Sequence, residues 1–169
     1  MLFEKYLMPD LMPGHFYDVT PEMVRGMGAR ALIFDIDNTL VTYDDPEPTE
    51  EVLQWFKLMN ENGIAVSFVS NNEKERVSVF NKKLGYVAYG KARKPFTKYL
   101  RLAVRDLGVE KNEVILLGDQ LLTDCAAAKS FGIKAIIVPP IKDKTSLFFR
   151  FKRFLEKPYV AKYKKEHKK

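Results

Sequence analysis

The chain has 169 residues, of which 46% are hydrophobic and 12% aromatic, with nine Gly and nine Pro. These values fit one globular domain and exclude a disordered, collagen-like or low-complexity chain. The single cysteine, Cys125, excludes an intrachain disulfide, and no apolar run approaches the roughly 20 residues that a membrane span needs. With no recognisable secretory leader, we expect a cytoplasmic protein.

The first 28 residues are interrupted by three prolines and by glycines. We expect them to form short helical turns that cover an edge or face of the sheet. Four short apolar runs follow, each ending in polar or turn residues, as strands buried on both faces do. The predicted strands of this parallel sheet are residues 31–35, 64–70, 114–119 and 134–138.

Amphipathic stretches with helix caps separate these strands. The alternation predicts a Rossmann-like, doubly wound α/β fold. In the third helix, Pro95 is expected in the first turn and Phe96 on the inward face. The four predicted helices run from a cap at Thr49 to Asn62-Gly63, from about Glu73 to Leu84, from Pro95 to Gly108, and from about Asp124 to Gly132.

The positive charge is concentrated at the C-terminus. Residues 142–169 contain 11 Lys and Arg and three acidic residues, a net charge of +8, which leaves −2 for residues 1–141. We therefore predict a single domain over residues 1–141, with its core at about 30–138, and a basic amphipathic extension over 142–169. Such an extension can contact an anionic membrane surface or nucleic acid, or can simply solubilise the chain.

This extension is expected to form a helix that begins at a cap on Thr145 or Ser146 and is ended by Pro158. Its apolar stripe either docks on the chain's own domain or lies on an anionic membrane. The stripe consists of Leu147, Phe148, Phe151, Phe154 and Leu155, with Arg150, Lys152 and Arg153 directed away from it.

Polar side chains follow three of the predicted strands, at the carboxyl ends where open parallel sheets bind ligands. The first strand ends in DIDNT (35–39), the second in SNN (70–72) and the third in GDQLLTD (118–124), while Lys94 precedes a helix. We expect these residues to meet in one crevice. Asn38, Thr39 and Gln120 are expected to hydrogen-bond the loops.

The chemistry that needs this set is phosphoryl transfer to a carboxylate. Asp35 and Asp119 can hold Mg²⁺, and Asp124 can hold a metal-bound water. The other oxygen of Asp35 is then the nucleophile that forms an acyl phosphate. Asp37, two residues further, can protonate the leaving oxygen and later take a proton from water. Ser70 and the Asn71 amide can bind phosphoryl oxygens, while Lys94 compensates their charge.

In this order, DxDxT (Asp35, Asp37, Thr39), Ser70, Lys94 and GDxxxxD (Asp119, Asp124) resemble the haloacid dehalogenase (HAD) superfamily of aspartate-nucleophile phosphatases. The resemblance covers about residues 30–138. It implies a Mg²⁺ cofactor, with the backbone carbonyl of Asp37 as a further ligand. The spacing between motifs leaves no room for a cap domain, which favours a large substrate or closure of the site by an oligomer.

The N-terminal segment, DIDNTL, SNN, KARKP and GDQLLTD are similar to the YqeG-type phosphatases of HAD subfamily IIIA. Their kinship with mitochondrial phosphatidylglycerophosphate phosphatases implies a lipid phosphate as substrate, at the inner face of a membrane. Two alternatives remain open. One is a polynucleotide end phosphatase whose basic tail follows the nucleic acid, and the other is a non-enzymatic interaction module that retains the fold and the Mg²⁺.

Overall fold

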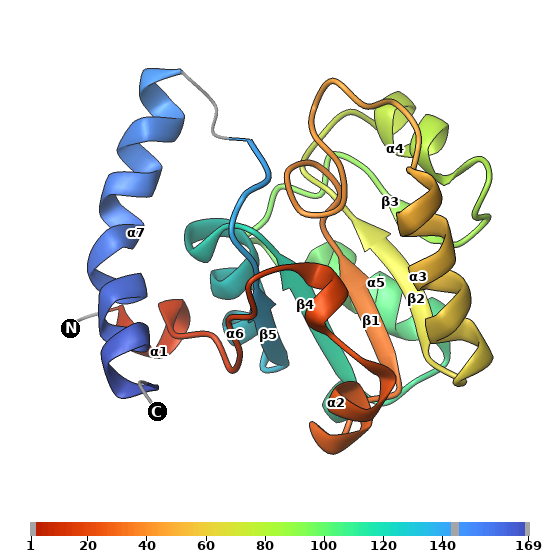
Figure 1. Cartoon of the computed structure of the whole chain (residues 1–169), viewed down its shortest axis with the longest axis horizontal. Coiled ribbons are helices and arrows are strands. Elements are labelled where there is room, and N and C mark those ends of the chain that lie inside the picture. Colours follow the sequence, from red (N-terminus) through yellow and green to blue (C-terminus); the bar gives the residue numbers. More distant parts are fainter. Residues whose placement is uncertain (1–2, 143–145, 168–169) are drawn as a thin grey trace.

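The computed structural model describes residues 3–142 and 146–167. Five parallel strands form one sheet in the order β3-β2-β1-β4-β5, and helices cover both faces (Figure 1). All four predicted strands are present, and a further short strand lies between Ser70 and Lys94. The strands are β1 (Ala31–Phe34), β2 (Ala65–Val69), β3 (Val87–Tyr89), β4 (Val114–Gly118) and β5 (Lys134–Ile137).

The helical elements connect the strands and flank the sheet at both ends of the chain. They are α1 (Glu4–Leu7), η1 (Phe16–Asp18), α2 (Pro21–Gly26), α3 (Glu50–Glu61), α4 (Lys74–Asn81), α5 (Lys98–Leu107), η2 (Lys111–Glu113), η3 (Leu121–Cys125), α6 (Ala126–Phe131) and α7 (Leu147–Glu166).

The sheet separates two hydrophobic clusters, because side chains alternate between its faces along each strand. Leu32 and Phe34 of β1 belong to the cluster that α2, α3 and α4 cover, whereas Ala31 and Ile33 belong to the one that α1, α5 and α6 cover. This arrangement confirms the doubly wound α/β fold. It also leaves the carboxyl ends of β1, β2 and β4 side by side, where the polar motifs begin.

The sequence predicts that the segment after Lys91 forms the first turn of a helix, but the structure shows that it does not. Pro95 lies in a loop, α5 begins only at Lys98, and Phe96 is 73% exposed instead of facing inward. The physical reason is a pair of hydrogen bonds, in which the Asn71 side chain accepts the Lys94 N–H and donates to the Lys94 carbonyl. The loop is thus held against the end of β2 rather than coiled into α5.

The C-terminal helix differs from its prediction in two ways. Pro158 does not end α7, which continues to Glu166. A proline removes one hydrogen bond within a helix, and here Tyr159, Val160 and Tyr163, just beyond it, pack against the domain and stabilise the continued helix. The predicted cap at Thr145 lies outside the described residues; Ser146 precedes the helix without a side-chain capping bond.

The predicted apolar stripe of α7 does not dock on the domain. Its five side chains are between 41% and 81% exposed. The helix contacts the domain instead through a different face, on which Glu156 and Tyr163 are buried. The stripe therefore lies on the outer side of α7, which stands beside the sheet end formed by β5 (Figure 1).

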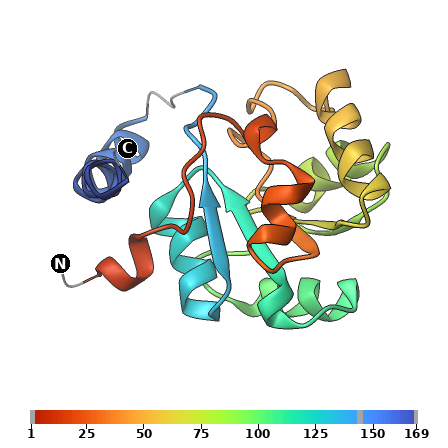
Figure 2. The same cartoon turned by 60° about the horizontal axis from the view of Figure 1, so that its bottom comes forward.

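The N-terminal segment lies along one edge of the sheet, as expected. Leu11 pairs with Ile136 of β5 in a parallel bridge, and the Ile137 N–H donates to the Leu11 carbonyl at 3.0 Å. Figure 2 shows this segment running beside β5. Among the described helices, none combines the length and apolarity required to cross a membrane.

Candidate active site

The loop after β1 carries Asp35 and Asp37 and turns sharply at Asn38. The backbone φ of Asn38 is 66°, in the left-handed region that Asn tolerates better than most residues. Its N–H donates to the Val41 carbonyl at 2.7 Å. Its side chain donates to the Lys142 carbonyl at 2.7 Å and accepts from the Lys142 N–H at 3.1 Å. Asn38 thus has a structural role and fixes the loop to the segment before α7.

Lys94 lies at the bottom of the crevice between two carboxylates. Its Nζ is 2.8 Å from Asp35 Oδ1 and 2.7 Å from Asp124 Oδ1, and all three side chains are buried. Asp124 Oδ2 also accepts the Gln120 N–H at 3.0 Å. The sequence predicted that these charged groups converge, and the structure brings them into direct contact.

Burial determines the protonation of this cluster. It raises the pKa of Asp35 to about 7, an effect that Lys94 opposes and that Asp124 and Asp37 reinforce. Burial lowers the pKa of Lys94, but the negative charges of Asp124 and Asp35 raise it by more, so its pKa lies above the ordinary value. The ammonium therefore stays charged, whereas the carboxyl of Asp35 is ready to gain or lose a proton near neutral pH.

Asp119, at the end of β4, is bound by Arg153, which the sequence had placed in a separate C-terminal extension. Arg153 of α7 forms an ion pair with Asp119 Oδ2 and donates to the Asp119 backbone carbonyl at 2.7 Å. It also contacts Glu156 at 2.9 Å. Burial raises the pKa of Asp119 to about 8, with Asp124 adding to the rise and Arg153 opposing it. The sequence placed Arg153 away from the apolar stripe, and the structure adds that it points into the domain, where buried Asp119 and Glu156 are its partners.

The carboxylates of Asp35, Asp119 and Asp124 fit a divalent metal ion. One oxygen from each lies within 4.8 Å of the others, and all three residues are buried. Oxygens around one Mg²⁺ lie about 3 to 4 Å apart, since the metal–oxygen distance is about 2.1 Å. A small shift of these side chains would bring them to that spacing, and the hard oxygen donors suit Mg²⁺.

Asp37 has both carboxylate oxygens engaged. Arg76 of α4 donates to Oδ1 from NH2 at 2.9 Å, and Asn72 donates to Oδ2 at 2.8 Å. Arg76 also donates to the backbone carbonyls of Asp45 and Pro46 at 2.7 and 2.8 Å. No sequence pattern pointed to Arg76, because its contact depends on how α4 lies against the loop after β1.

The two residues predicted to bind phosphate from the end of β2 lie close to the acidic cluster. Ser70 is buried, and its hydroxyl accepts the Asn72 N–H at 3.1 Å. The Asn71 side chain accepts the Lys94 N–H at 2.6 Å and donates to the Lys94 carbonyl at 3.1 Å. The side chain of Asn71 therefore positions Lys94, while phosphate binding by its amide stays a prediction.

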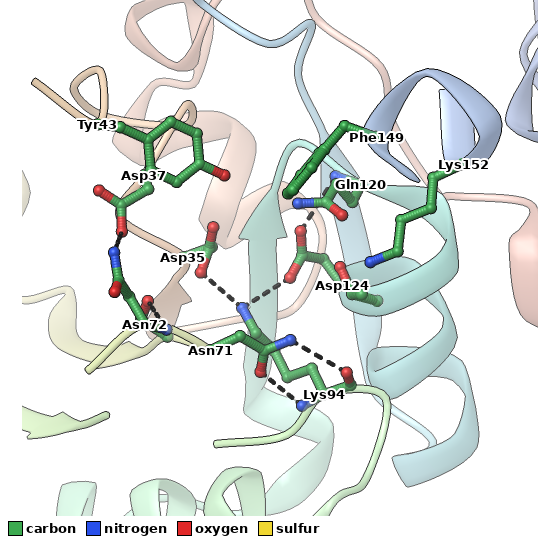
Figure 3. A pocket seen from close by; sticks show the side chains of 12 residues that line it. Asp35, Asp37, Tyr43, Asn71, Asn72, Lys94, Gln120, Asp124, Phe149 and Lys152 are labelled. Carbon is green, nitrogen blue, oxygen red and sulfur yellow. Dashed lines mark hydrogen bonds and ion pairs between the residues drawn. The ribbon is translucent and has the colours of Figure 1, made fainter. Parts of the chain in front are cut away.

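One pocket lies at the carboxyl ends of the strands (Figure 3), and it is lined by Asp35, Asp37, Ser70, Asn71, Lys94 and Asp124. Its wall also includes Tyr43 from the loop after β1 and two residues of α7, Phe149 and Lys152. The rings of Tyr43 and Phe149 meet edge to face, with their centroids 6.4 Å apart. The part that α7 plays in this pocket could not be read from its basic amphipathic pattern, which predicted a separate extension.

The fold and the order of its strand-end motifs define a HAD-like α/β hydrolase. A family model described as HAD-hydrolase-like matches residues 91–143. Over 165 residues the chain is 35% identical to "Probable phosphatase YqeG" of Bacillus subtilis (strain 168), covering 98% of this chain and 96% of that one. The chain belongs to the HAD-like phosphatase family that includes YqeG.

Solved structures of other proteins share the fold. An uncharacterized protein from Listeria monocytogenes serotype 4b matches with a TM-score of 0.55 and 17% identity, over 69% of this chain and 84% of that one. A "putative phosphoglycolate phosphatase" from Lactobacillus delbrueckii subsp. bulgaricus matches with a TM-score of 0.51 and 23% identity, over 67% of this chain and 54% of that one. These likenesses support the HAD-like architecture alone.

Proposed function

We propose that the protein is a Mg²⁺-dependent phosphomonoester hydrolase that acts through a phosphorylated Asp35. The observation that carries this proposal is the contact of Lys94 with both Asp35 and Asp124, inside a cluster that Asp119 completes. A carboxylate nucleophile needs nearby positive charge, because the phosphoryl group that it attacks is itself negative. Lys94 provides one such charge at the strand ends.

Asp35, Asp119 and Asp124, the last through water, together with the Asp37 backbone carbonyl, would hold the Mg²⁺. The ion would neutralise the negative charge of the phosphoryl group and of its carboxylate neighbours. In the first step, a carboxylate oxygen of Asp35 bonds to phosphorus, the bond from phosphorus to the leaving oxygen breaks, and Asp37 gives that oxygen a proton. In the second, water attacks phosphorus, Asp37 takes its proton, and Asp35 is released with inorganic phosphate.

Ser70 and the Asn71 amide would bind the non-bridging phosphoryl oxygens in both steps. Asp37 can act as acid only after leaving at least one of its bonds, because Arg76 and Asn72 occupy both of its oxygens. Its position two residues after Asp35 keeps it on the same loop as the nucleophile. A modest rotation of the side chain would then direct it towards the leaving oxygen.

For the substrate, we propose a phosphorylated lipid, with phosphatidylglycerophosphate as the first candidate from the sequence resemblance. The support is the exposed apolar stripe of α7, which neighbours exposed Arg150 and Lys157 on the same helix. Apolar side chains beside cations are complementary to an anionic bilayer. The helix also contributes Phe149 and Lys152 to the pocket, so the stripe would bring the pocket to the inner membrane surface of the cell.

The test is Mg²⁺-dependent phosphate release from phosphatidylglycerophosphate vesicles, a 3′-phosphorylated oligonucleotide and an aryl phosphate, with Asp35→Asn as control. We expect turnover of the lipid well above the others and none by the variant. Turnover of the aryl phosphate alone would keep the mechanism and reject the lipid. Preference for the oligonucleotide would favour the polynucleotide alternative, and no Asp35-dependent release would contradict the proposed activity.

A further inference from the structure

The first turns of α7 form one side of the catalytic pocket. Phe149 is half-buried and packs against Tyr43, and Lys152 extends from the helix towards the pocket beside Asp124 (Figure 3). The Lys152 Nζ lies 4.8 Å from the centroid of the Phe148 ring and 5.5 Å from that of Phe149. Aromatic faces hold an ammonium weakly without neutralising its charge. Lys152 is therefore a positioned cation at the pocket wall.

The other cations that the structure describes around the pocket are paired with carboxylates. Lys94 is bound by Asp35 and Asp124, Arg76 by Asp37, and Arg153 by Asp119 and Glu156. Within residues 3–142 and 146–167, no carboxylate lies within ion-pair distance of Lys152. An ammonium that lines a phosphate-handling pocket without a protein counter-ion is suited to an anionic group of a ligand.

The direction of phosphoryl transfer indicates which part of the substrate Lys152 meets. In an in-line displacement the leaving oxygen lies opposite the attacking oxygen. Asp35 and Lys94 form the inner end of the pocket at β1, whereas Phe149 and Lys152 enter from α7 (Figure 3). A leaving group that points away from Asp35 and out of the pocket would pass the wall that α7 provides.

We propose that Lys152, supported by Phe149, forms a subsite for a second phosphate group on the leaving-group side of the substrate. The proposal rests on the proposed phosphatase function and narrows its substrate class to monoesters that carry another phosphate a few bonds away. The HAD-like core has no inserted cap domain that could select the substrate. In this chain the C-terminal helix would perform that selection instead. Lys152 is a specificity residue and takes no part in the bond changes at phosphorus.

A matched pair of substrates tests this subsite. Propane-1,3-diyl bisphosphate and 3-hydroxypropyl phosphate share the same scissile monoester and differ only in the second phosphate. Wild type should hydrolyse the bisphosphate with a kcat/KM about 10-fold or more above that for the monophosphate, as expected for one charge-assisted hydrogen bond. Lys152→Met should remove this preference, chiefly by raising the KM for the bisphosphate.

Two control variants separate charge from structure. Lys152→Arg should retain most of the preference, and Lys157→Met, which removes an exposed lysine of the same helix outside the pocket, should retain all of it. If Lys152→Met lowered kcat/KM equally for both substrates, the ammonium would act on the transferred phosphoryl group, and the proposal would be overturned. Unchanged kinetics on both, or a wild type without the preference, would overturn it as well.

Binding distinguishes failure of this subsite from failure of the proposed activity. Calorimetric titration of the bisphosphate into Asp35→Asn, with and without Lys152→Met, requires no turnover. We expect about a 10-fold weaker affinity in the double variant. If wild type releases no phosphate but this difference is present, the activity is wrong and the subsite stands. If turnover depends on Asp35 but affinity does not change with Lys152, the subsite is wrong.

Discussion

The Nζ of Lys94 joins Asp35 and Asp124, at 2.8 and 2.7 Å from one carboxylate oxygen of each. Each carboxylate follows a different strand, so a single ammonium links the ends of β1 and β4. Lys94 itself is held by the Asn71 side chain at the end of β2. Lys94 thus compensates the charge of both carboxylates and connects segments that follow three neighbouring strands.

Lys94→Met should destabilise the metal-free protein by about 3 kcal/mol or more at pH 8, because it leaves buried carboxylates without their partner. The loss should shrink at lower pH, where those carboxyls are neutralised by protons. Chemical denaturation at pH 8 and at a lower pH measures the loss of stability. Lys82→Met, which replaces an exposed lysine, is the control. Equal stability of Lys94→Met and the control would contradict the structural role of this contact.

The metal-free protein should lose stability as the pH rises from about 4 to about 8. In the unfolded chain the carboxyls of Asp35 and Asp119 titrate near pH 4, whereas burial raises their pKa in the folded chain to about 7 and about 8. The folded state therefore binds more protons in this interval, and each rise in pH favours unfolding. Thermal unfolding in EDTA across the interval measures the slope.

Two further measurements identify the source of that slope. Asp119→Asn should flatten it, since the amide does not titrate. Mg²⁺ added at the alkaline end should restore stability, because the ionised carboxylates are the form that binds metal. Stability that rises with pH in EDTA would show that these carboxyls do not carry the raised pKa values.

Arg153→Met should lower the free energy of unfolding by about 2 to 4 kcal/mol, because it leaves buried Glu156 and Asp119 without a shared cation. Glu156→Gln added to this variant should recover part of the loss. The amide oxygen can still accept the Leu122 N–H, which Glu156 accepts at 3.0 Å, without an uncompensated charge. A double-variant cycle gives the coupling energy, and a value near zero would mean that Arg153 and Glu156 act independently.

Asp37→Asn should reduce kcat by about 10²- to 10⁴-fold, the usual contribution of a positioned acid and base. Its amide can still bond to Asn72 or Arg76, so the fold should be unchanged. Mg²⁺ should still stabilise this variant against thermal unfolding, since Asp37 is proposed to bind the ion through its backbone carbonyl. Retention of wild-type turnover would overturn the acid and base assignment.

Phe151→Glu with Phe154→Glu should abolish sedimentation with phosphatidylglycerol vesicles, because both side chains lie on the exposed stripe of α7. Turnover of a soluble aryl phosphate should stay within about twofold of wild type, since neither residue lines the pocket. Val79→Glu, on the exposed side of α4, is the matched control. If wild type sedimented equally well with phosphatidylcholine vesicles, the proposed charge complementarity between α7 and an anionic bilayer would be contradicted.

The sheet and most of the acidic cluster could be predicted from the sequence, because the apolar runs and their terminal residues are local features. Asp35 and Asp119 had to meet once their strands were neighbours and parallel. Arg76, Lys152 and Arg153 could not be assigned in the same way. Each lies on a helix among other charged residues, and its role depends on the position of that helix beside a loop distant in sequence.

The pairing of Leu11 with Ile136 has a consequence for self-association. An uncovered edge strand offers unpaired N–H and carbonyl groups to a neighbouring chain. At β5 the N-terminal segment occupies such groups, including the Ala135 carbonyl and the Ile137 N–H. The opposite edge is the three-residue β3, too short to template a long ladder. The sheet is thereby protected at both margins from growing into another molecule's sheet, which favours assembly, where it occurs, through side-chain surfaces.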